Sequence, residues 1–234
     1  MPQTNRNGRQ PAHYTLILGT KNWSSWSLRP YLAMRATGAA FDEIVVPLRR
    51  DTTSPEILQY SPSGRVPLLR IEEGGETTTV FDSLAICETL AERHPEAGLW
   101  PQDWRARALA RSYAAEMHAG FAPLRSSLSM EIARALPTPE LSLETKANIA
   151  RILDAWTWAL TRYGKDGGFL FGRFSIADCM YAPVVSRFRT YAIDLPEIAA
   201  AYSDRIFALA GMQDWIRDAE AEIAGGLPPL AALP

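Results

Sequence analysis

The order of apolar and polar residues in the first part of the chain predicts strands joined by a helix. The short apolar run Tyr14–Leu18 predicts a buried strand, and helical spacing follows up to Gly38, which suits a left-handed helix end. The β-branched run Phe41–Val46, ended by Pro47, predicts a second strand. Two strands joined by one helix indicate a parallel β-α-β unit. The apolar positions that set the helical spacing are Leu28, Tyr31, Leu32 and Ala36.

A hairpin and two helix starts are predicted next. Ser54-Pro55-Glu56 places proline at the first position of a short helix. The runs Val66–Ile71 and Thr77–Phe81 flank the turn Glu73–Gly75, which predicts an antiparallel hairpin. Asp82–Ser83 then begins another helix, because both residue types are good N-caps.

After the linker Pro95–Pro101 the pattern is helical throughout. Residues 106–121 keep helical spacing in a long segment that bends or ends near Pro123, and Leu143–Tyr163 continues in the same way. Ser175–Asp178 matches a capping box, in which a hydroxyl and a carboxylate satisfy opposite N–H groups at a helix start. We expect this box to stabilise the fold and to have no part in the chemistry.

These patterns predict an α/β domain over residues 13–95 and an all-helical domain over residues 103–224. The 234 residues are enough for two domains with a sizeable core, and 47% hydrophobic with 21% charged residues is typical of a soluble globular protein. The opening Met1–Ala12 is polar and lacks an apolar stretch, so we expect a loose tail and no secretory signal. The final Gly225–Pro234 is predicted to be irregular.

Charge and cysteine content exclude several classes of function. The net charge of −2 gives no footprint for nucleic acid or for an anionic membrane, and no apolar run approaches the ~20 residues that span a bilayer. The two cysteines, Cys87 and Cys179, are far apart and form no C-x-x-C pair. We therefore expect no metal site, two reduced and buried thiols, and a cytoplasmic location.

The candidate chemistry lies in Lys21–Pro30, K-N-W-S-S-W-S-L-R-P, at the predicted strand-to-helix turn. Ser24, Ser25 and Ser27 crowd a helix start, where free N–H groups and a partial positive charge suit a small anion such as a thiolate. Simple helix capping explains the serines equally well. We favour Ser27 as the N-cap, because Pro30 then falls in the first turn and the other two hydroxyls stay free to face a ligand.

Two further segments each have a structural and a functional interpretation. Pro67 opens its strand either as an edge-strand residue or as a cis-proline that exposes neighbouring backbone groups to a ligand. Asp82 and Ser83 are either plain helix caps or a ligand site, in which the acid suits an α-ammonium group and the hydroxyl suits a carboxylate.

In this order the motifs resemble the glutathione transferases over about Tyr14–Glu222. They are the turn S-S-W-S-L-R-P, the segment S-P-S-G-R-V-P-L-L, the helix start F-D-S-L-A-I and the box G-R-F-S-I-A-D. The resemblance implies a thioredoxin-like N-terminal domain, an all-helical C-terminal domain, glutathione as co-substrate and usually a homodimer. The turn also resembles the zeta-class S-S-C-x-W-R, but Trp26 stands in the cysteine position and Leu28 in that of the tryptophan, which argues against maleylacetoacetate isomerase activity without excluding it.

The resemblance also implies roles for individual residues. Ser24 matches the hydroxyl that meets the glutathione sulfur, and the backbone of Val66 matches the group that pairs with the cysteinyl part. Pro67 matches the cis-proline, while Asp82 and Ser83 match the pair that holds the γ-glutamyl end. The glutathione-binding residues expected in this way are Ser25, Arg65, Val66, Pro67, Asp82 and Ser83.

The residues and the resemblance together indicate thiol activation. The turn carries Ser24-x-x-Ser27 where thioredoxin-like redox proteins carry C-x-x-C, so the nucleophilic sulfur comes from glutathione and Ser24 donates a hydrogen bond to it. Lowering a thiol pKa of ~8.5 by about two units needs ~2.7 kcal/mol. One charge-assisted hydrogen bond and a helix N-terminus supply this without a metal.

Aromatic and apolar residues near the turn and on the long helix are candidates for an electrophile pocket. Ordinary packing between the domains explains the same residues at least as well. The candidates are Trp23, Trp26, Tyr113, Met117 and Phe121. His118 is most simply a partly buried helix histidine.

The predicted function is a glutathione transferase that moves an alkyl or aryl group of a small, mostly apolar electrophile onto the glutathione sulfur in detoxification. The alternatives are a glutathione-dependent isomerase similar to maleylacetoacetate isomerase, a non-catalytic binding or regulatory protein, and a thiol-disulfide reductase acting through glutathione. Pocket hydroxyls such as Ser24 and Ser83 argue against an inert scaffold, and the absence of cysteine from the turn argues against the reductase.

Overall fold

The structure is a computed structural model and describes residues 12–232. The predicted tail Met1–Ala12 therefore lies outside the described residues except for Ala12. Within this range no helix is long and apolar enough to cross a membrane.

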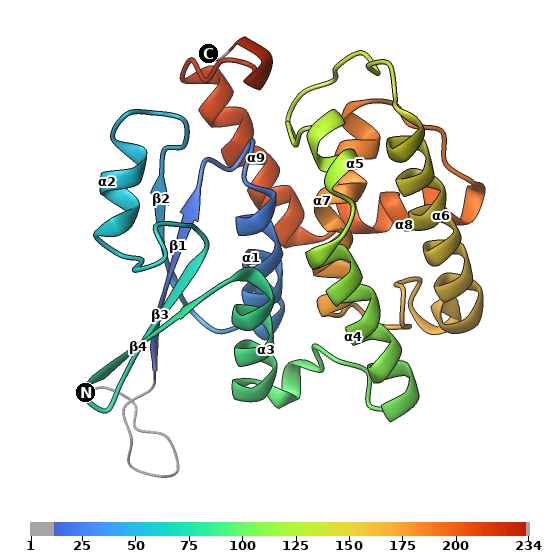
Figure 1. The fold of residues 1–234 in the computed structure, drawn as a ribbon. Helices are drawn as coiled ribbons and strands as arrows, with labels where there is room; N and C mark the ends of the chain where they lie inside the picture. Colours follow the sequence, from blue (N-terminus) through green and yellow to red (C-terminus); the bar gives the residue numbers. More distant parts are fainter. Residues whose placement is uncertain (1–11, 233–234) are drawn as a thin grey trace.

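The chain begins with the predicted β-α-β unit (Figure 1). Strand β1 (His13–Gly19) leads into helix α1 (Ser25–Thr37) and then strand β2 (Asp42–Val46). β1 and β2 pair in parallel with Ile17 opposite Ile44. The prediction of a parallel unit is confirmed.

The predicted hairpin forms strands β3 (Leu68–Glu73) and β4 (Glu76–Phe81), which pair antiparallel. β3 also pairs antiparallel with β1, so the strand order is β2-β1-β3-β4. The edge-strand interpretation of Pro67 is therefore wrong, because β3 is an interior strand. The peptide bond between Val66 and Pro67 is cis, as the alternative required.

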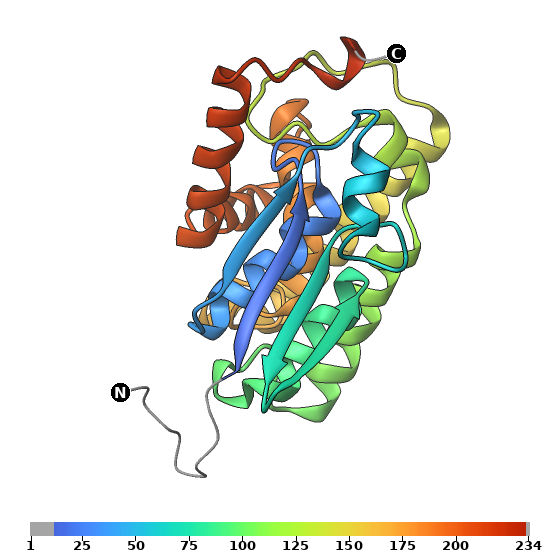
Figure 2. The same ribbon diagram turned by 90° about the vertical axis from the view of Figure 1, so that its left-hand side faces the viewer.

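Helices cover both faces of the sheet, which gives the expected thioredoxin-like arrangement (Figures 1 and 2). Helices α1 and α3 (Ser83–Arg93) lie on one face and α2 (Thr53–Leu58) lies on the other. Because successive residues of a strand point to opposite faces, Leu16 and Leu18 belong to the large core on the α1 side, and Ile17 belongs to a small cluster under α2.

The second part of the described chain is helical. Helix α6 has the predicted bounds, whereas the predicted segment 106–121 divides at Gly120, because Phe121 adopts a left-handed conformation with φ of 60°. The capping box is present: Asp178 accepts the backbone N–H of Ser175 at 2.9 Å. The elements are η1 (Pro95–Ala97), α4 (Trp104–Ala119), α5 (Ala122–Ser127), α6 (Leu143–Tyr163), η2 (Gly164–Asp166), α7 (Ile176–Thr190), α8 (Glu197–Phe207), α9 (Ala210–Ala224) and η3 (Leu230–Ala232).

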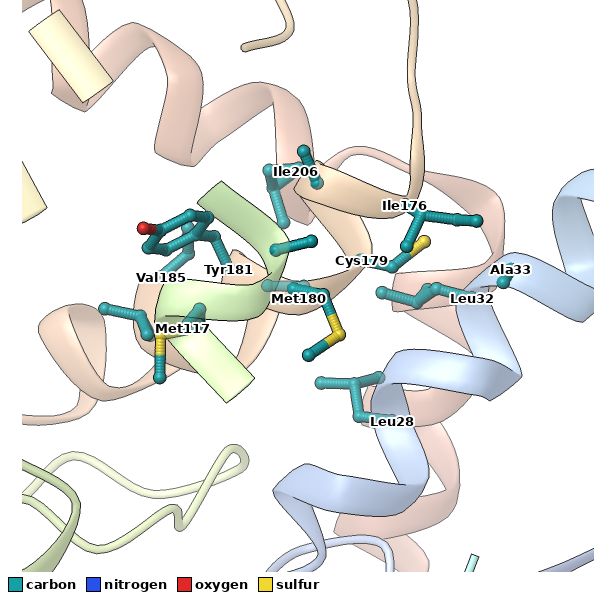
Figure 3. Packing of buried hydrophobic residues seen from close by; sticks show 14 of the residues in the cluster. Leu28, Leu32, Ala33, Met117, Ile176, Cys179, Met180, Tyr181, Val185 and Ile206 are labelled. Atoms are coloured by element: carbon teal, nitrogen blue, oxygen red, sulfur yellow. The ribbon is translucent and has the colours of Figure 1, made fainter. Parts of the chain in front are cut away.

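The two parts share one core, in which α1 packs against α7 (Figure 3). Leu28 and Leu32 of α1 lie beside Met180 and Cys179 of α7. Cys179 and Cys87 are free and fully buried, and burial raises the pKa of both thiols. The prediction of two buried thiols is confirmed.

Candidate active site

The turn between β1 and α1 ends at Ser24, which is the N-cap of α1. Its Oγ accepts the N–H of Ser27 at 3.4 Å. The prediction that Ser27 caps the helix is wrong, because Ser27 is fully buried and its Oγ accepts the N–H of Gly19 at 3.0 Å. Pro30 therefore lies inside α1, beyond the first turn, where its lack of an N–H removes a helical hydrogen bond.

Two serines of this turn, Ser24 and Ser27, are joined by a buried hydrogen bond. Ser24 donates its hydroxyl to Ser27 Oγ at 2.7 Å. Ser24 and Ser25 are 6% and 5% exposed, so both hydroxyls lie almost completely inside the protein. Neither Ser24 nor Ser25 lines a cavity that opens beside the start of α3.

That cavity has a volume of about 560 Å³ and opens between the start of α3, the loop before β3 and the C-terminal end of α4. It brings together Trp26 and five of the six predicted glutathione-binding residues. The lining residues are Trp26, Ser63, Arg65, Val66, Pro67, Phe81, Asp82, Ser83 and His118.

Asp82 and Ser83 present polar groups to this cavity from the first turn of α3. Asp82 has a φ of 77°, and its Oδ1 accepts the N–H groups of Leu84 at 2.9 Å and Ala85 at 3.3 Å. Ser83 is 1% exposed, and its Oγ has no hydrogen-bond partner within residues 12–232. A buried hydroxyl without a partner at a helix N-terminus is a candidate ligand contact.

His118 on α4 reaches the same cavity, which the sequence did not indicate. Its Nε2 lies 3.2 Å from Asp82 Oδ2, and its ring packs edge-on against Trp26 with centroids 5.3 Å apart. Its Nδ1 is buried and finds no partner in the described part of the chain. Histidine on a helix has no distinctive spacing, so only the packing of α4 on α1 and α3 reveals this contact.

Ser63 and Phe81 also line the cavity without having been predicted. Each could have been found by its position, because Ser63 lies in the loop before Val66 and Phe81 directly precedes Asp82. Among residues 12–232, no group of three or more His, Cys, Asp or Glu is placed to hold a metal ion.

The remaining candidates for the electrophile pocket lie elsewhere. Trp23 lines a second cavity of about 440 Å³, on the side of the turn that faces the end of α9. Met117 is fully buried in the core shown in Figure 3, and Tyr113 packs edge-on against Phe171 with centroids 5.3 Å apart. Phe121, 9% exposed, belongs to the same core. These four residues thus lie outside the cavity that Trp26 lines.

Positive charge gathers behind the cavity wall. The guanidinium carbons of Arg29 and Arg125 lie 4.2 and 5.5 Å from the centre of the Trp26 ring. Arg29 is fully buried, and burial, together with the charges of Arg187 and Arg125, lowers its pKa to about 9. Arg29 still carries its charge at neutral pH, so this wall favours an anionic ligand.

Two family models match the chain. Residues 23–93 match the glutathione S-transferase N-terminal domain, and residues 102–232 match the glutathione S-transferase C-terminal domain.

Curated relatives are similar at moderate identity. Maleylacetoacetate isomerase of Pseudomonas aeruginosa is 32% identical over 47% of this chain, and the match spans about half, 52%, of that protein. Maleylacetoacetate isomerase of Rattus norvegicus is 27% identical over 73% of this chain and 76% of its own length. Glutathione S-transferase 1 of Dianthus caryophyllus is 29% identical over 74% and 78%.

Solved structures match nearly the whole chain. A maleylacetoacetate isomerase from Anaeromyxobacter dehalogenans with bound GSH is 28% identical over 90% of this chain and 97% of its own, with a TM-score of 0.66. A Burkholderia glutathione transferase homolog with bound glutathione, 23% identical over 89% and 98% with a TM-score of 0.66, shows the same fold.

Proposed function

The chain belongs to the glutathione S-transferase family, and we propose that it activates the thiol of bound glutathione for attack on a small, mostly apolar electrophile. The observation that carries the proposal is the Ser83 hydroxyl, which is buried without a partner among the described residues and lies in the cavity at the start of α3. Such a hydroxyl is destabilising unless a ligand satisfies it. A carboxylate suits it, because the helix N-terminus adds free N–H groups and a partial positive charge.

Glutathione fits the polar groups along the cavity. Its γ-glutamyl carboxylate would accept from Ser83, while its α-ammonium would lie near Asp82. By family resemblance the backbone of Val66 pairs with the cysteinyl part, and Arg65 supplies a positive charge for the second carboxylate of the tripeptide.

Ser24 is the proposed donor to the sulfur. Its hydroxyl points to Ser27 Oγ at 2.7 Å, but hydroxyl hydrogens rotate, so Ser27 can donate to Ser24 while Ser24 donates to the thiolate. Gly19 N–H continues to donate to Ser27 Oγ throughout. Lowering the glutathione pKa by about two units needs ~2.7 kcal/mol. A charge-assisted hydrogen bond contributes ~1.5–3 kcal/mol and the N-terminus of α1 a further ~0.3–1 kcal/mol.

A glutathione-dependent isomerisation is the second candidate, favoured by the buried positive charge of Arg29 behind Trp26. Maleylacetoacetate carries carboxylates, which such a wall would attract, and several similar proteins bear the name maleylacetoacetate isomerase. Incubation with maleylacetoacetate separates the two activities, because isomerisation leaves the glutathione concentration unchanged and conjugation consumes it.

The proposal includes the setting in which the protein works. Free, fully buried Cys87 and Cys179 fit a reducing compartment such as the cytoplasm. A homodimer, which the family resemblance implies, and a role in detoxification are part of the same proposal.

Titration with glutathione, followed by tryptophan fluorescence, tests the proposed function. Trp26 lines the cavity, so saturable quenching is expected at millimolar glutathione or below, together with thiolate absorbance in the ultraviolet. S-methylglutathione is the matched control, because it should quench without any thiolate signal. Ser83→Ala should weaken binding about tenfold, a loss of ~1.4 kcal/mol. Absence of saturable quenching in this range would overturn the proposal.

A further inference from the structure

Helix α9 holds the backbone of the turn that leads to Ser24. The two carboxylate oxygens of Glu222 accept the N–H groups of Lys21 and Asn22, both at 2.8 Å. Trp215 Nε1 donates to the carbonyl oxygen of Lys21, also at 2.8 Å. Side chains of α9 thus satisfy three backbone groups in two successive residues.

The side chains of the same two residues are fixed as well. The side chain of Lys21 is 5% exposed, and its Nζ lies 2.5 Å from Asp218 of α9 and 2.6 Å from Glu43 of β2. Asn22 is fully buried, and its side-chain oxygen accepts the N–H of Ala133 at 3.1 Å. Lys21 and Asn22 are therefore held by partners from the sheet, from α9 and from the loop after α5.

These contacts determine where Ser24 lies. The backbone N–H of Ser24 donates to Thr20 at 2.8 Å, so the turn closes on itself around Lys21 and Asn22. Those two residues belong to no strand or helix, so their N–H groups depend on Glu222. A carboxylate that accepts two backbone N–H groups fixes both the position and the orientation of the turn.

We propose that Glu222 is a positioning residue, which holds the turn so that the Ser24 hydroxyl meets the sulfur of glutathione; this inference rests on the proposed function. Glu222 lines the second cavity, beside Trp23, and not the cavity at the start of α3. It would therefore act on Ser24 through the backbone of Lys21 and Asn22. Burial raises the pKa of Glu222, while the two N–H donors and the charge of Lys21 favour the carboxylate form.

Glu222→Gln tests the proposal with almost no change in size. The amide has one acceptor oxygen, so one of the two backbone N–H groups then faces an NH₂ group that cannot accept. A small displacement of a reacting group costs rate more than binding, so kcat should fall about tenfold while the KM for glutathione changes less than about twofold. The pKa of the bound thiol should rise. Glu220→Gln, at an exposed position of the same helix, is the matched control and should behave as the wild type.

Hydrogen exchange of the Lys21 and Asn22 amides gives a readout that needs no substrate. Both amides should exchange faster in Glu222→Gln than in the wild type, with the melting temperature little changed. Unchanged kcat and unchanged thiol pKa in this variant would overturn the proposal, as would a parallel loss of kcat, glutathione binding and melting temperature. If the wild type itself binds no glutathione, the proposed function fails first. If the wild type forms the thiolate and Glu222→Gln forms it equally well, this inference alone is overturned and the proposed function stands.

Discussion

The two turns of the candidate site are held by partners at very different distances along the chain. Asp82 caps α3 by accepting N–H groups only two and three residues away. The turn before Ser24 is held by Glu222, whose contacts with Lys21 and Asn22 span 201 and 200 residues. The first turn is thus built within one helix start, whereas the second is complete only when α9 packs against the sheet domain.

On the proposed function, this difference separates binding from activation. The turn at Asp82 and Ser83, the local turn, would hold the γ-glutamyl end of glutathione. The turn that Glu222 holds, the long-range turn, carries Ser24, which would meet the sulfur. Variants of Asp82 should therefore act mainly on KM, and variants around Ser24 mainly on kcat.

Ser24→Ala alters the long-range turn and has the largest expected effect on the rate. Loss of the donor to the thiolate costs ~2.7 kcal/mol, so kcat should fall about 100-fold. The fold should persist, because the lost N-cap lowers the free energy of unfolding by only ~1 kcal/mol. Steady-state conjugation kinetics and thermal unfolding measure the two effects.

Ser25→Ala is the matched control, since Ser25 is as buried as Ser24 but is not the helix cap. It should keep most of the conjugation rate. A full rate in Ser24→Ala would instead transfer the role of donor to Ser25 or Ser27.

Variants of Asp82 alter the local turn, and their expected effects on binding and stability are smaller. Asp82→Ala removes both the cap and the charge and places alanine at a φ of 77°, so the free energy of unfolding should fall by ~1–3 kcal/mol. Asp82→Asn keeps a capping oxygen and should leave the free energy of unfolding within ~0.5 kcal/mol of the wild type.

Both Asp82 variants lose the charge that would face the α-ammonium, so the KM for glutathione should rise about tenfold in each, with kcat nearly constant. Binding and unfolding measured on the same two proteins separate the roles. An unchanged KM in Asp82→Asn would show that the residue is a helix cap and nothing more.

The same contrast explains what the sequence could predict. The fold followed from local patterns, each of which depends only on residues close by in the sequence. They include the apolar run at Tyr14–Leu18, the left-handed Gly38 at the end of α1 and the capping box at Ser175. Asp82 and Ser83 could be placed at a helix start for the same reason. The cis form of Pro67 was one of two alternatives, and the pairing of β3 with β1 decided which strand is interior.

The remaining features depend on contacts between distant segments. Ser27 has the residue type of a cap, but Gly19 N–H and the Ser24 hydroxyl both use its oxygen. Met117 and His118 are neighbours on α4, yet one is buried in the core and the other faces the cavity. Helical spacing alone does not say which neighbouring element a side chain meets.

His118 sharpens the comparison, because its contact with Asp82 joins the helical domain to the local turn. Its Nε2 lies 3.2 Å from Asp82 Oδ2 and can orient that carboxylate toward an ammonium group. The His118 side chain is 27% exposed, so this pair contributes at most ~1 kcal/mol. His118→Ala should raise the KM for glutathione about threefold and leave kcat unchanged, a smaller rise than in the Asp82 variants.

His118→Gln separates orientation from packing, because its amide can donate to Asp82 but cannot reproduce the edge-on contact of the ring with Trp26. If orientation of Asp82 is the role, the glutamine variant restores the wild-type KM. If His118→Ala and His118→Gln raise the KM equally, the role of His118 is to pack against Trp26. A lower KM in His118→Ala would mean that the histidine competes with glutathione for Asp82. In that case the helical domain weakens glutathione binding at the local turn.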